Sequence, residues 1–222
     1  MEINIQKRVL EANENESEKL KRFFKEKNVF VLNVMSSPGS GKTETLVKTL
    51  NRIMPEIRTA VIVGDICTTN DADRLDATGA EVTQINTDKF GGDCHLAANL
   101  IESTAREFDL DNIDLLIVEN IGNLVCPAEF DIGEDARTVV LSVTEGEDKP
   151  LKYPLMFRLA HSAILNKIDL LPYLDFDIDE AEKNIKEINP DMPVYRISAT
   201  KEQGLDPWIK WLKDMVKSKI NP

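Results

Sequence analysis

The sequence predicts an α/β fold, a doubly wound and mainly parallel sheet, because short apolar runs alternate with helix-length amphipathic stretches. Several of the runs, such as LLIV and VVL, are apolar without alternation, which is typical of strands buried on both faces. The 222 residues leave room for one ordinary domain or two small ones. We expect one domain, because no internal repeat and no Gly/Ser linker interrupts the pattern.

The elements follow one another in a regular order. Residues 1–27 are expected to form an N-terminal helical extension, with the helix itself over 3–27, because apolar side chains recur within a charged stretch. Strands are expected at 29–35, 60–64, 82–85, 115–118, 138–143, 163–165 and 194–197. The clearest helices are expected at 43–54, 96–108, 177–188 and 207–218. Residues 28–220 would then form a single domain that carries the chemical motifs.

The charge balance limits the classes of partner. The chain has 27 basic and 39 acidic residues, for a net charge of −12, whereas nucleic acids and anionic membranes bind basic faces. Neither is therefore an expected partner. No run approaches the ~20 apolar residues of a membrane span, and no signal-peptide core is visible. Three cysteines, an odd and low number, suit a reducing compartment. We expect a cytoplasmic protein.

The strongest motif is SSPGSGKT at residues 36–43, between an expected strand and an expected helix. Backbone N–H groups at such a helix start cradle phosphates, so Lys42 would reach the β- and γ-phosphates and the Thr43 hydroxyl would bind Mg²⁺. Ser36 stands where the usual pattern has glycine. A turn with only a capping role is the alternative, and the strand–helix context disfavours it. The expected phosphate ligands are Gly39, Ser40, Gly41, Lys42, Thr43 and Thr45.

A second motif specifies the base. Asn166, Lys167 and Asp169 form NKID directly after an apolar run. In P-loop GTPases this carboxylate accepts hydrogen bonds from N1 and the exocyclic amine of guanine, a donor pair that adenine lacks. Alone, the tetrapeptide is equally consistent with a helix start, but its place after a strand and downstream of the phosphate loop favours GTP. The expected guanine-backing loop is Ser198, Ala199 and Thr200.

Carboxylates near strand ends are candidates for handling Mg²⁺ and water. Asp65 and Glu119 close two expected strands, and ligands gather at the carboxyl ends of parallel strands. We expect both to join Thr43 around Mg²⁺, with the N–H of Gly122 at the γ-phosphate. For Asp71, helix capping and a part in hydrolysis remain open.

A metal constellation is suggested by Cys94 and His95, which are adjacent, and by Cys126 in a later loop. Imidazole and thiolate are good ligands for Ni²⁺ or Zn²⁺. Neighbours on a regular helix point about 100° apart, so Cys94 and His95 can share a metal only from a loop or a first helical turn. Spacing alone leaves buried cysteines and a surface histidine as an alternative. Cys67 and His161 are expected to be structural.

Five segments resemble the family of hydrogenase nickel-incorporation GTPases (HypB): SSPGSGKT, GDICTTNDADR, ENIGNLVCPAEFD, SVTEGEDKPLKYP and NKIDLLPYLDFD. The likeness runs in order from about residue 33 to residue 211. It implies a P-loop GTPase of the nucleotide-dependent dimerising class, a homodimer when GTP is bound. It further implies Mg²⁺ and Ni²⁺ (or Zn²⁺) as metals, with other hydrogenase maturation proteins and the hydrogenase large subunit as partners.

The resemblance also assigns roles to residues. Cys94, His95 and Cys126 match the family's metal site, and Asp71 matches a switch carboxylate implicated in hydrolysis. Lys152 matches a lysine that reaches the partner subunit's nucleotide. The apolar positions Leu170 and Leu174 match residues that support dimerisation. The cysteine-rich or histidine-rich N-terminal tract of some relatives has no counterpart in residues 1–66.

The leading hypothesis is therefore a GTPase that assists nickel insertion into nickel-iron hydrogenase. Lys42, Asp71 and Asp65 would form its catalytic set, with Asp71 positioning the attacking water. One alternative is a urease-type accessory GTPase, which the resemblance disfavours because Cys126-Pro127 is not followed by histidine. Another is a metal-binding regulator in which nucleotide only locks the oligomer. Steady phosphate release would exclude that regulator.

Overall fold

The protein is described by a computed structural model that covers residues 2–54, 56–65, 69–87 and 95–220. Its sheet has seven parallel strands in the order β3-β2-β4-β1-β5-β6-β7. They are β1 Phe30–Ser36, β2 Thr59–Asp65, β3 Glu81–Asn86, β4 Leu115–Glu119, β5 Ala136–Ser142, β6 Ser162–Asn166 and β7 Val194–Arg196. The predicted parallel sheet is confirmed, and each of the seven apolar runs overlaps a strand, with ends that differ by one or a few residues.

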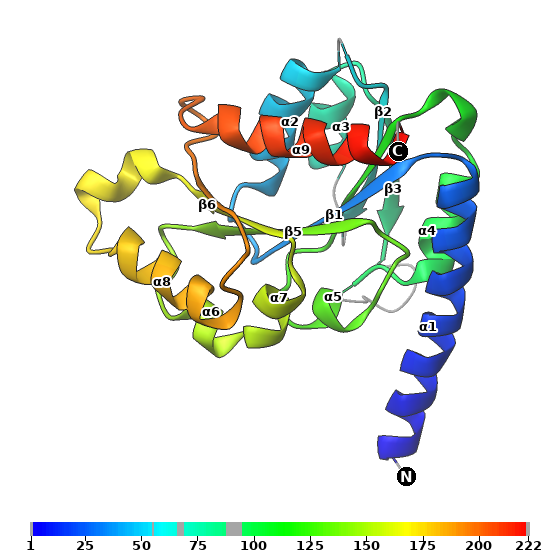
Figure 1. Cartoon of the computed structure of the whole chain (residues 1–222), viewed down its shortest axis with the longest axis horizontal. Helices are drawn as coiled ribbons and strands as arrows, with labels where there is room; N and C mark the ends of the chain where they lie inside the picture. The colour runs from blue at the N-terminus through cyan, green and yellow to red at the C-terminus, as the bar shows by residue number, and fades with distance from the viewer. Residues whose placement is uncertain (1, 55, 66–68, 88–94, 221–222) are drawn as a thin grey trace.

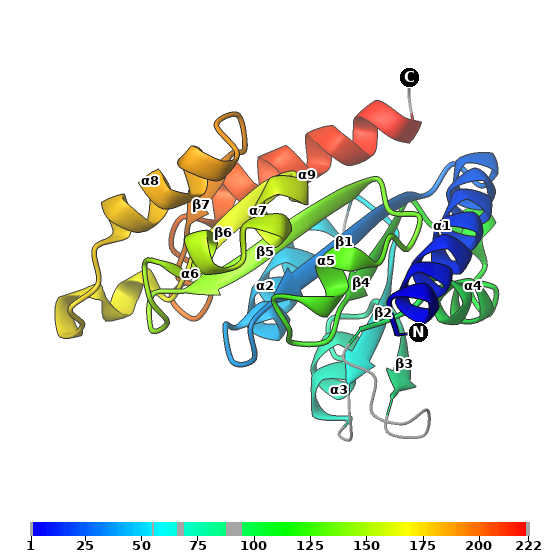
Figure 2. The same cartoon turned by 90° about the horizontal axis from the view of Figure 1, so that it is seen from below.

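Helices cover both faces of the sheet (Figure 1). One face carries α2 Lys42–Ile53, α3 Asn70–Asp76 and α9 Leu205–Ile220. The other carries α1 Glu2–Glu26, α4 Ala98–Ala105, α5 Cys126–Glu129, α6 Lys149–Lys152, α7 Pro154–Leu159 and α8 Ile178–Ile188, seen from below in Figure 2. Two 3₁₀ segments, η2 Leu110–Asn112 and η3 Ile168–Tyr173, complete the described elements. None of the described helices is both long enough and apolar enough to cross a membrane.

Strand β1 shows why the apolar runs do not alternate with polar residues. Phe30 and Leu32 pack in the cluster shared with α2 and α9, while Val31 packs in the cluster shared with α1 and α4. Successive side chains point to opposite faces, so helices on both faces leave no polar face on a central strand. All seven residues of β1 are buried.

The last turns of α1 belong to the core rather than to a free extension. Leu20 and Phe24 are 1% and 0% exposed and pack with apolar residues of β2, β4 and α4. Towards its N-terminus, α1 continues beyond α4 (Figure 1). One side of this helix therefore lies against the domain as far back as Asn13, which is 9% exposed.

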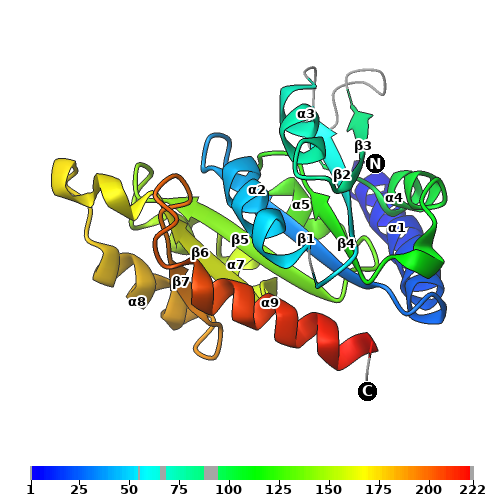
Figure 3. The same cartoon turned by 90° about the horizontal axis from the view of Figure 1, so that it is seen from above.

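Helix α9 packs beside α2 on the opposite face of the sheet (Figure 3). Trp208 is 1% exposed, and its Nε1–H donates to Thr49 Oγ1 of α2 at 3.0 Å. Trp211 stacks on Trp208 with ring centroids 5.2 Å apart. A buried indole needs a partner for its N–H, so this bond fixes α9 against the helix that follows the phosphate loop.

Candidate nucleotide and metal site

The phosphate-binding motif lies at the centre of the sheet. Strand β1 pairs with β4 and β5 and leads through residues 37–41 into α2. Lys42 Nζ donates to Ser36 Oγ at 2.9 Å, so the lysine lies back over the loop. Thr45 Oγ1 donates to the carbonyl oxygen of Gly41 at 2.8 Å and secures the first turn of the helix. The strand, loop and helix expected from the sequence are all present.

Glu119 and Asp65 come together on the α2 side of the sheet. Glu119 is the register partner of Val34 in β1 and of Val63 in β2. Asp65 lies two residues beyond Val63 and therefore points to the same face. Thr43 Oγ1 of α2 donates to Glu119 Oε1 at 2.8 Å.

Two buried oxygens at this point fit an incoming ligand. In the described part of the chain, Glu119 Oε2 and Ser40 Oγ are buried and have no hydrogen-bond partner. A buried carboxylate oxygen without a partner is costly, and Mg²⁺ prefers oxygen ligands of this kind. Thr43 and Glu119, with Asp65 beside them, therefore fit a magnesium ion.

Charge reinforces this interpretation. Burial raises the pKa of Glu119 to about 7, although the nearby Lys42 ammonium opposes the shift. Burial lowers the pKa of Lys42, opposed by Glu119, Asp71 and Asp65. Asp71 lies in the first turn of α3, 3.7 Å from Arg74. Lys42 thus lies in the field of Glu119, Asp71 and Asp65, the three carboxylates that the sequence predicts to handle Mg²⁺ and water.

The raised pKa of Glu119 predicts a pH-dependent stability. The folded chain keeps this proton up to about pH 7, whereas the unfolded chain releases it near 4.5. The stabilising contribution of Glu119 to the free energy of unfolding of the nucleotide-free protein should therefore be complete below pH 4.5. It should be lost as the pH rises from 4.5 through 7. The expected loss is about 3 kcal/mol. Urea unfolding at a series of pH values from 4.5 to 8 measures it.

The matched variant is Glu119→Gln, which keeps the shape of the side chain but cannot ionise. The difference between wild type and E119Q should grow over this pH range in favour of the variant. Parallel pH profiles for the two proteins would show that Glu119 does not titrate in this window.

The NKID segment, which the sequence predicts to recognise the base, contacts the phosphate loop directly. Asn166 Nδ2 donates to the Ser40 carbonyl oxygen at 2.9 Å, and Lys167 Nζ donates to the Gly39 carbonyl oxygen at 2.6 Å. Asn166 Oδ1 accepts from the N–H of Ala199 at 3.2 Å. Asn166 therefore joins three loops that are far apart in sequence.

Asp169, the carboxylate expected to select guanine, is held in place by a hydrogen bond from Ser198. Ser198 Oγ donates to Asp169 Oδ1 at 2.5 Å and accepts from the N–H of Lys201 at 3.2 Å. The exposed Thr200 lies alongside, with its Oγ1 3.4 Å from Ser198 Oγ. These contacts orient Asp169 and hold the loop after β7 against it.

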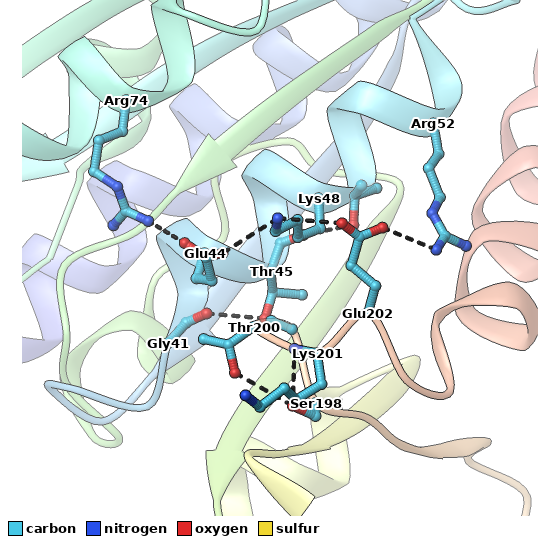
Figure 4. Close-up of polar contacts among 12 residues, drawn as sticks. Gly41, Glu44, Thr45, Lys48, Arg52, Arg74, Ser198, Thr200, Lys201 and Glu202 are labelled. Atoms are coloured by element: carbon cyan, nitrogen blue, oxygen red, sulfur yellow. Dashed lines mark hydrogen bonds and ion pairs between the residues drawn. The ribbon is translucent and has the colours of Figure 1, made fainter. Parts of the chain in front are cut away.

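An ion-pair network that the sequence did not suggest fastens this loop to α2 (Figure 4). Glu202 pairs with Lys48 at 3.2 Å and with Arg52 at 3.1 Å. One turn earlier on the same side of the helix, Glu44 pairs with Lys48 at 3.9 Å and with Arg74 of α3. Each exposed pair is weak by itself, because solvent and salt screen the two charges. Together they connect α3, α2 and the loop after β7.

The loop after β4 lies directly on the phosphate loop. A Cβ on Gly122 would be 3.0 Å from Pro38 Cα, so a side chain there would press the two loops apart by a few tenths of an ångström. Asn123 follows, and its Oδ1 accepts from the N–H of Val125 at 2.8 Å. Its Nδ2 donates to Cys126 Sγ at 3.4 Å. Asn123, which the sequence reasoning missed, thereby connects the loop that touches Pro38 with a candidate metal ligand.

Of the three expected metal ligands, the structure describes His95 and Cys126. His95 stacks on Phe130 with ring centroids 3.7 Å apart and an interplanar angle of 20°. Cys126 is disulfide-bonded, so its thiolate becomes a ligand only after reduction. Cys94 and Cys67 lie outside the described residues, and the described residues alone contain no group of three His, Cys, Asp or Glu that could hold a metal. The donors present, an imidazole and a sulfur, suit nickel.

The remaining sequence candidates are placed as follows. His161 Nδ1 accepts from the N–H of Arg137 at 3.1 Å, which agrees with a structural role. Lys152 is exposed and pairs with Asp148 at 2.6 Å, rather than with the phosphate loop of its own chain. Leu170 lies within η3, and Leu174, just after it, is 38% exposed.

Comparisons with known proteins agree with this geometry. Residues 30–196 match the family model described as CobW/HypB/UreG, nucleotide-binding domain. The chain is 49% identical to the hydrogenase maturation factor HypB of Escherichia coli K12, covering 92% of this chain and 70% of the relative. It is 37% identical to the hydrogenase/urease maturation factor HypB of Helicobacter hepaticus, covering 91% and 84%.

A solved structure gives the same result for the fold. The crystal structure of HypB from Helicobacter pylori in complex with nickel matches with a TM-score of 0.86 and 34% identity, covering 95% of this chain and 98% of that one. The resemblance expected from the sequence is confirmed, as is the P-loop GTPase fold. The chain belongs to the CobW/HypB/UreG family, and within it to the HypB hydrogenase maturation factors.

Proposed function

We propose that the chain hydrolyses GTP to GDP and phosphate and couples this cycle to the delivery of nickel during hydrogenase maturation. One observation carries the proposal: Lys42, Thr43, Glu119 and Asn166 lie around a single phosphate loop, and the loop that touches it continues to Cys126. Hydrolysis and metal exchange would thus share one structural element.

Hydrolysis needs positioning and charge neutralisation rather than a covalent intermediate. Lys42 and the N-terminus of α2 would neutralise the phosphate oxygens, and Gly122 would donate its N–H to the γ-phosphate. Thr43 and Glu119, with Asp65, would hold Mg²⁺, which supplies further positive charge when bound. Asp71 lies in the first turn of α3, where its carboxylate would orient the attacking water.

Specificity for guanine would come from Asp169. Its carboxylate accepts from Ser198 through Oδ1, and that bond fixes the plane of the group. The N1–H and the exocyclic amine of guanine would donate to the two carboxylate oxygens. Adenine presents no donor pair at this edge, so ATP would bind poorly.

Coupling to nickel would run through residues 122–126. A γ-phosphate held by Gly122 constrains Asn123, and Asn123 contacts the sulfur of Cys126. Cys94, His95 and Cys126 are the proposed ligands, and the reduced thiolates they require suit the cytoplasm. A GTP-bound homodimer, in which Lys152 reaches the partner's nucleotide, belongs to the proposal, as do other maturation proteins and the hydrogenase large subunit.

The coupling predicts that nucleotide state changes nickel binding. Reduced protein is titrated with Ni²⁺ in the Mg-GDP form and in the form bound to a non-hydrolysable GTP analogue. We expect nickel affinities that differ at least about fivefold. The readouts are thiolate-to-nickel absorbance for binding and light scattering for molar mass.

The same titration separates two interpretations. A doubled mass with the analogue, together with altered nickel affinity, supports a chaperone controlled by GTP. Equal nickel affinity in both forms contradicts the coupling, and the protein would then act as a nucleotide switch for docking partners.

Urease is a second candidate recipient of the nickel. The observation in its favour is the relative from Helicobacter hepaticus, whose name includes both hydrogenase and urease maturation. Parallel activation assays with an apo-hydrogenase and an apo-urease would distinguish the recipients. We expect nickel-dependent activation in the hydrogenase assay, and activation of the urease alone would overturn this choice.

A further inference from the structure

One side chain of α1 bridges the two segments that carry the candidate metal ligands. Asn13 Nδ2 donates to the Asp131 carbonyl oxygen at 2.7 Å, and Asn13 Oδ1 accepts from the N–H of Ala98 at 3.2 Å. Ala98 lies three residues after His95, and Asp131 lies five residues after Cys126. Because the amide is 9% exposed, water competes weakly for either bond.

The bond to Ala98 supplies a hydrogen-bond acceptor that the His95 segment lacks. Ala98 is the first residue of α4, and the N-cap residue Ala97 has no side chain that can accept its first N–H groups. Asn13 supplies that acceptor from another helix. Leu96, 0% exposed, anchors the same segment in the apolar cluster with Leu20 of α1.

The bond to Asp131 acts on the Cys126 segment. Phe130, the residue before Asp131, carries the ring that stacks on His95. Farther along, Gly133 has a φ of +75°, and a Cβ there would be 2.9 Å from the Lys21 nitrogen of α1. The loop after α5 is therefore pressed against α1 at two points.

A pocket of about 580 Å³ between these elements is lined by Asn13 together with His95 and Phe130. Helix α1 thus borders the candidate ligand directly, although Asn13 itself makes its bonds to backbone atoms. Groups that orient metal ligands from behind commonly control affinity by 10- to 100-fold.

We propose that Asn13 is a positioning residue for the metal site, which sets the separation of the His95 and Cys126 segments. The inference rests on the proposed function in one respect, that His95 and Cys126 bind nickel. The two ligand segments would already be held at the correct separation, so less ordering of the chain is required when nickel binds.

The test compares four variants of the full-length, reduced protein with the wild type. Asn13→Ala removes both bonds, and Asn13→Asp keeps the acceptor for Ala98 but places an oxygen against the Asp131 carbonyl. Asn15→Ala is the matched control, because Asn15 is an exposed asparagine of α1 that bonds only within its helix, to the Glu11 carbonyl oxygen. His95→Ala tests the metal site itself.

Two readouts are taken with NiCl₂ alone: the Kd from titration, and the nickel-induced shift of the unfolding midpoint by circular dichroism. We expect N13A and N13D to weaken nickel binding by about tenfold and to shrink the nickel-induced shift, whereas N15A matches the wild type. A purely structural role would lower the midpoint without nickel but leave the shift and the Kd unchanged.

The outcomes separate the two proposals. Wild-type nickel binding in H95A overturns the proposed metal site. Weakened binding in H95A, together with wild-type values in N13A and N13D, overturns the positioning role of Asn13 and leaves the metal site standing. Should N13A fail to fold, N13D decides through the same two measurements.

Discussion

Replacing Lys42 by alanine is expected to lower the rate of GTP hydrolysis by about 100- to 1000-fold. The ammonium lies at the phosphate loop, 2.9 Å from Ser36 Oγ. In the proposed mechanism it neutralises charge that builds up on the phosphate oxygens during transfer. Steady-state phosphate release with Mg-GTP measures the effect.

The folded state should survive this change. Burial lowers the pKa of Lys42, which shows that its charge is costly at this place. Once the ammonium is gone, Glu119 can stay protonated and neutral. The comparison is Lys210→Ala, which removes an exposed lysine of α9 whose Nζ lies 2.5 Å from Asp214. A K42A protein that turns over GTP as fast as K210A would rule out the phosphate-binding assignment.

The second large effect concerns the choice of base. Asp169→Asn should lower kcat/KM for GTP by about 1000-fold and make xanthosine triphosphate the better substrate. The asparagine amide offers a donor where the carboxylate offered an acceptor. Xanthine has a carbonyl oxygen where guanine has its exocyclic amine, so the new donor meets an acceptor. Parallel assays with both nucleotides measure the exchange.

Asp175→Asn applies the same chemical change to an exposed carboxylate beyond η3, and we expect it to keep the wild-type preference for GTP. If D169N still prefers GTP to xanthosine triphosphate, Asp169 is not the residue that selects the base. The Ser198 hydroxyl that donates to Asp169 can still donate to the asparagine oxygen, so the variant should retain its local structure.

Buried parallel strands were the most predictable elements, since both faces of runs such as 115–118 are apolar and no competing pattern exists. The shortest helices were not predicted. Helices α5 and α6 have four residues each and begin with a proline in their first turn, so they have too few residues for any periodicity. Helix α4 spans Ala98–Ala105 rather than 96–108, because Ala97 is extended and Leu96 turns into the core.

The candidate site was likewise predictable in part only. Motif spacing placed Lys42, Thr43 and Glu119 together, because each lies at a strand end or at the start of α2. Sequence could not reveal Asn13, whose two partners lie 85 and 118 residues away. Nor could it show that Asn166 would contact the phosphate loop itself, through the carbonyl oxygen of Ser40. Such contacts depend on the assembled fold.

The packing of α9 beside α2 has a consequence for fluorescence measurements. The two tryptophans of the chain are Trp208 and Trp211, and both lie on α9. Trp208 is bonded to Thr49 of α2, the helix that begins at the phosphate loop. Intrinsic fluorescence is therefore a label-free signal from the nucleotide face alone, with no indole near α1 or His95. Nickel bound at the proposed ligands would give an absorbance signal from the other face, so one cuvette could follow the two events separately and reveal their order in time.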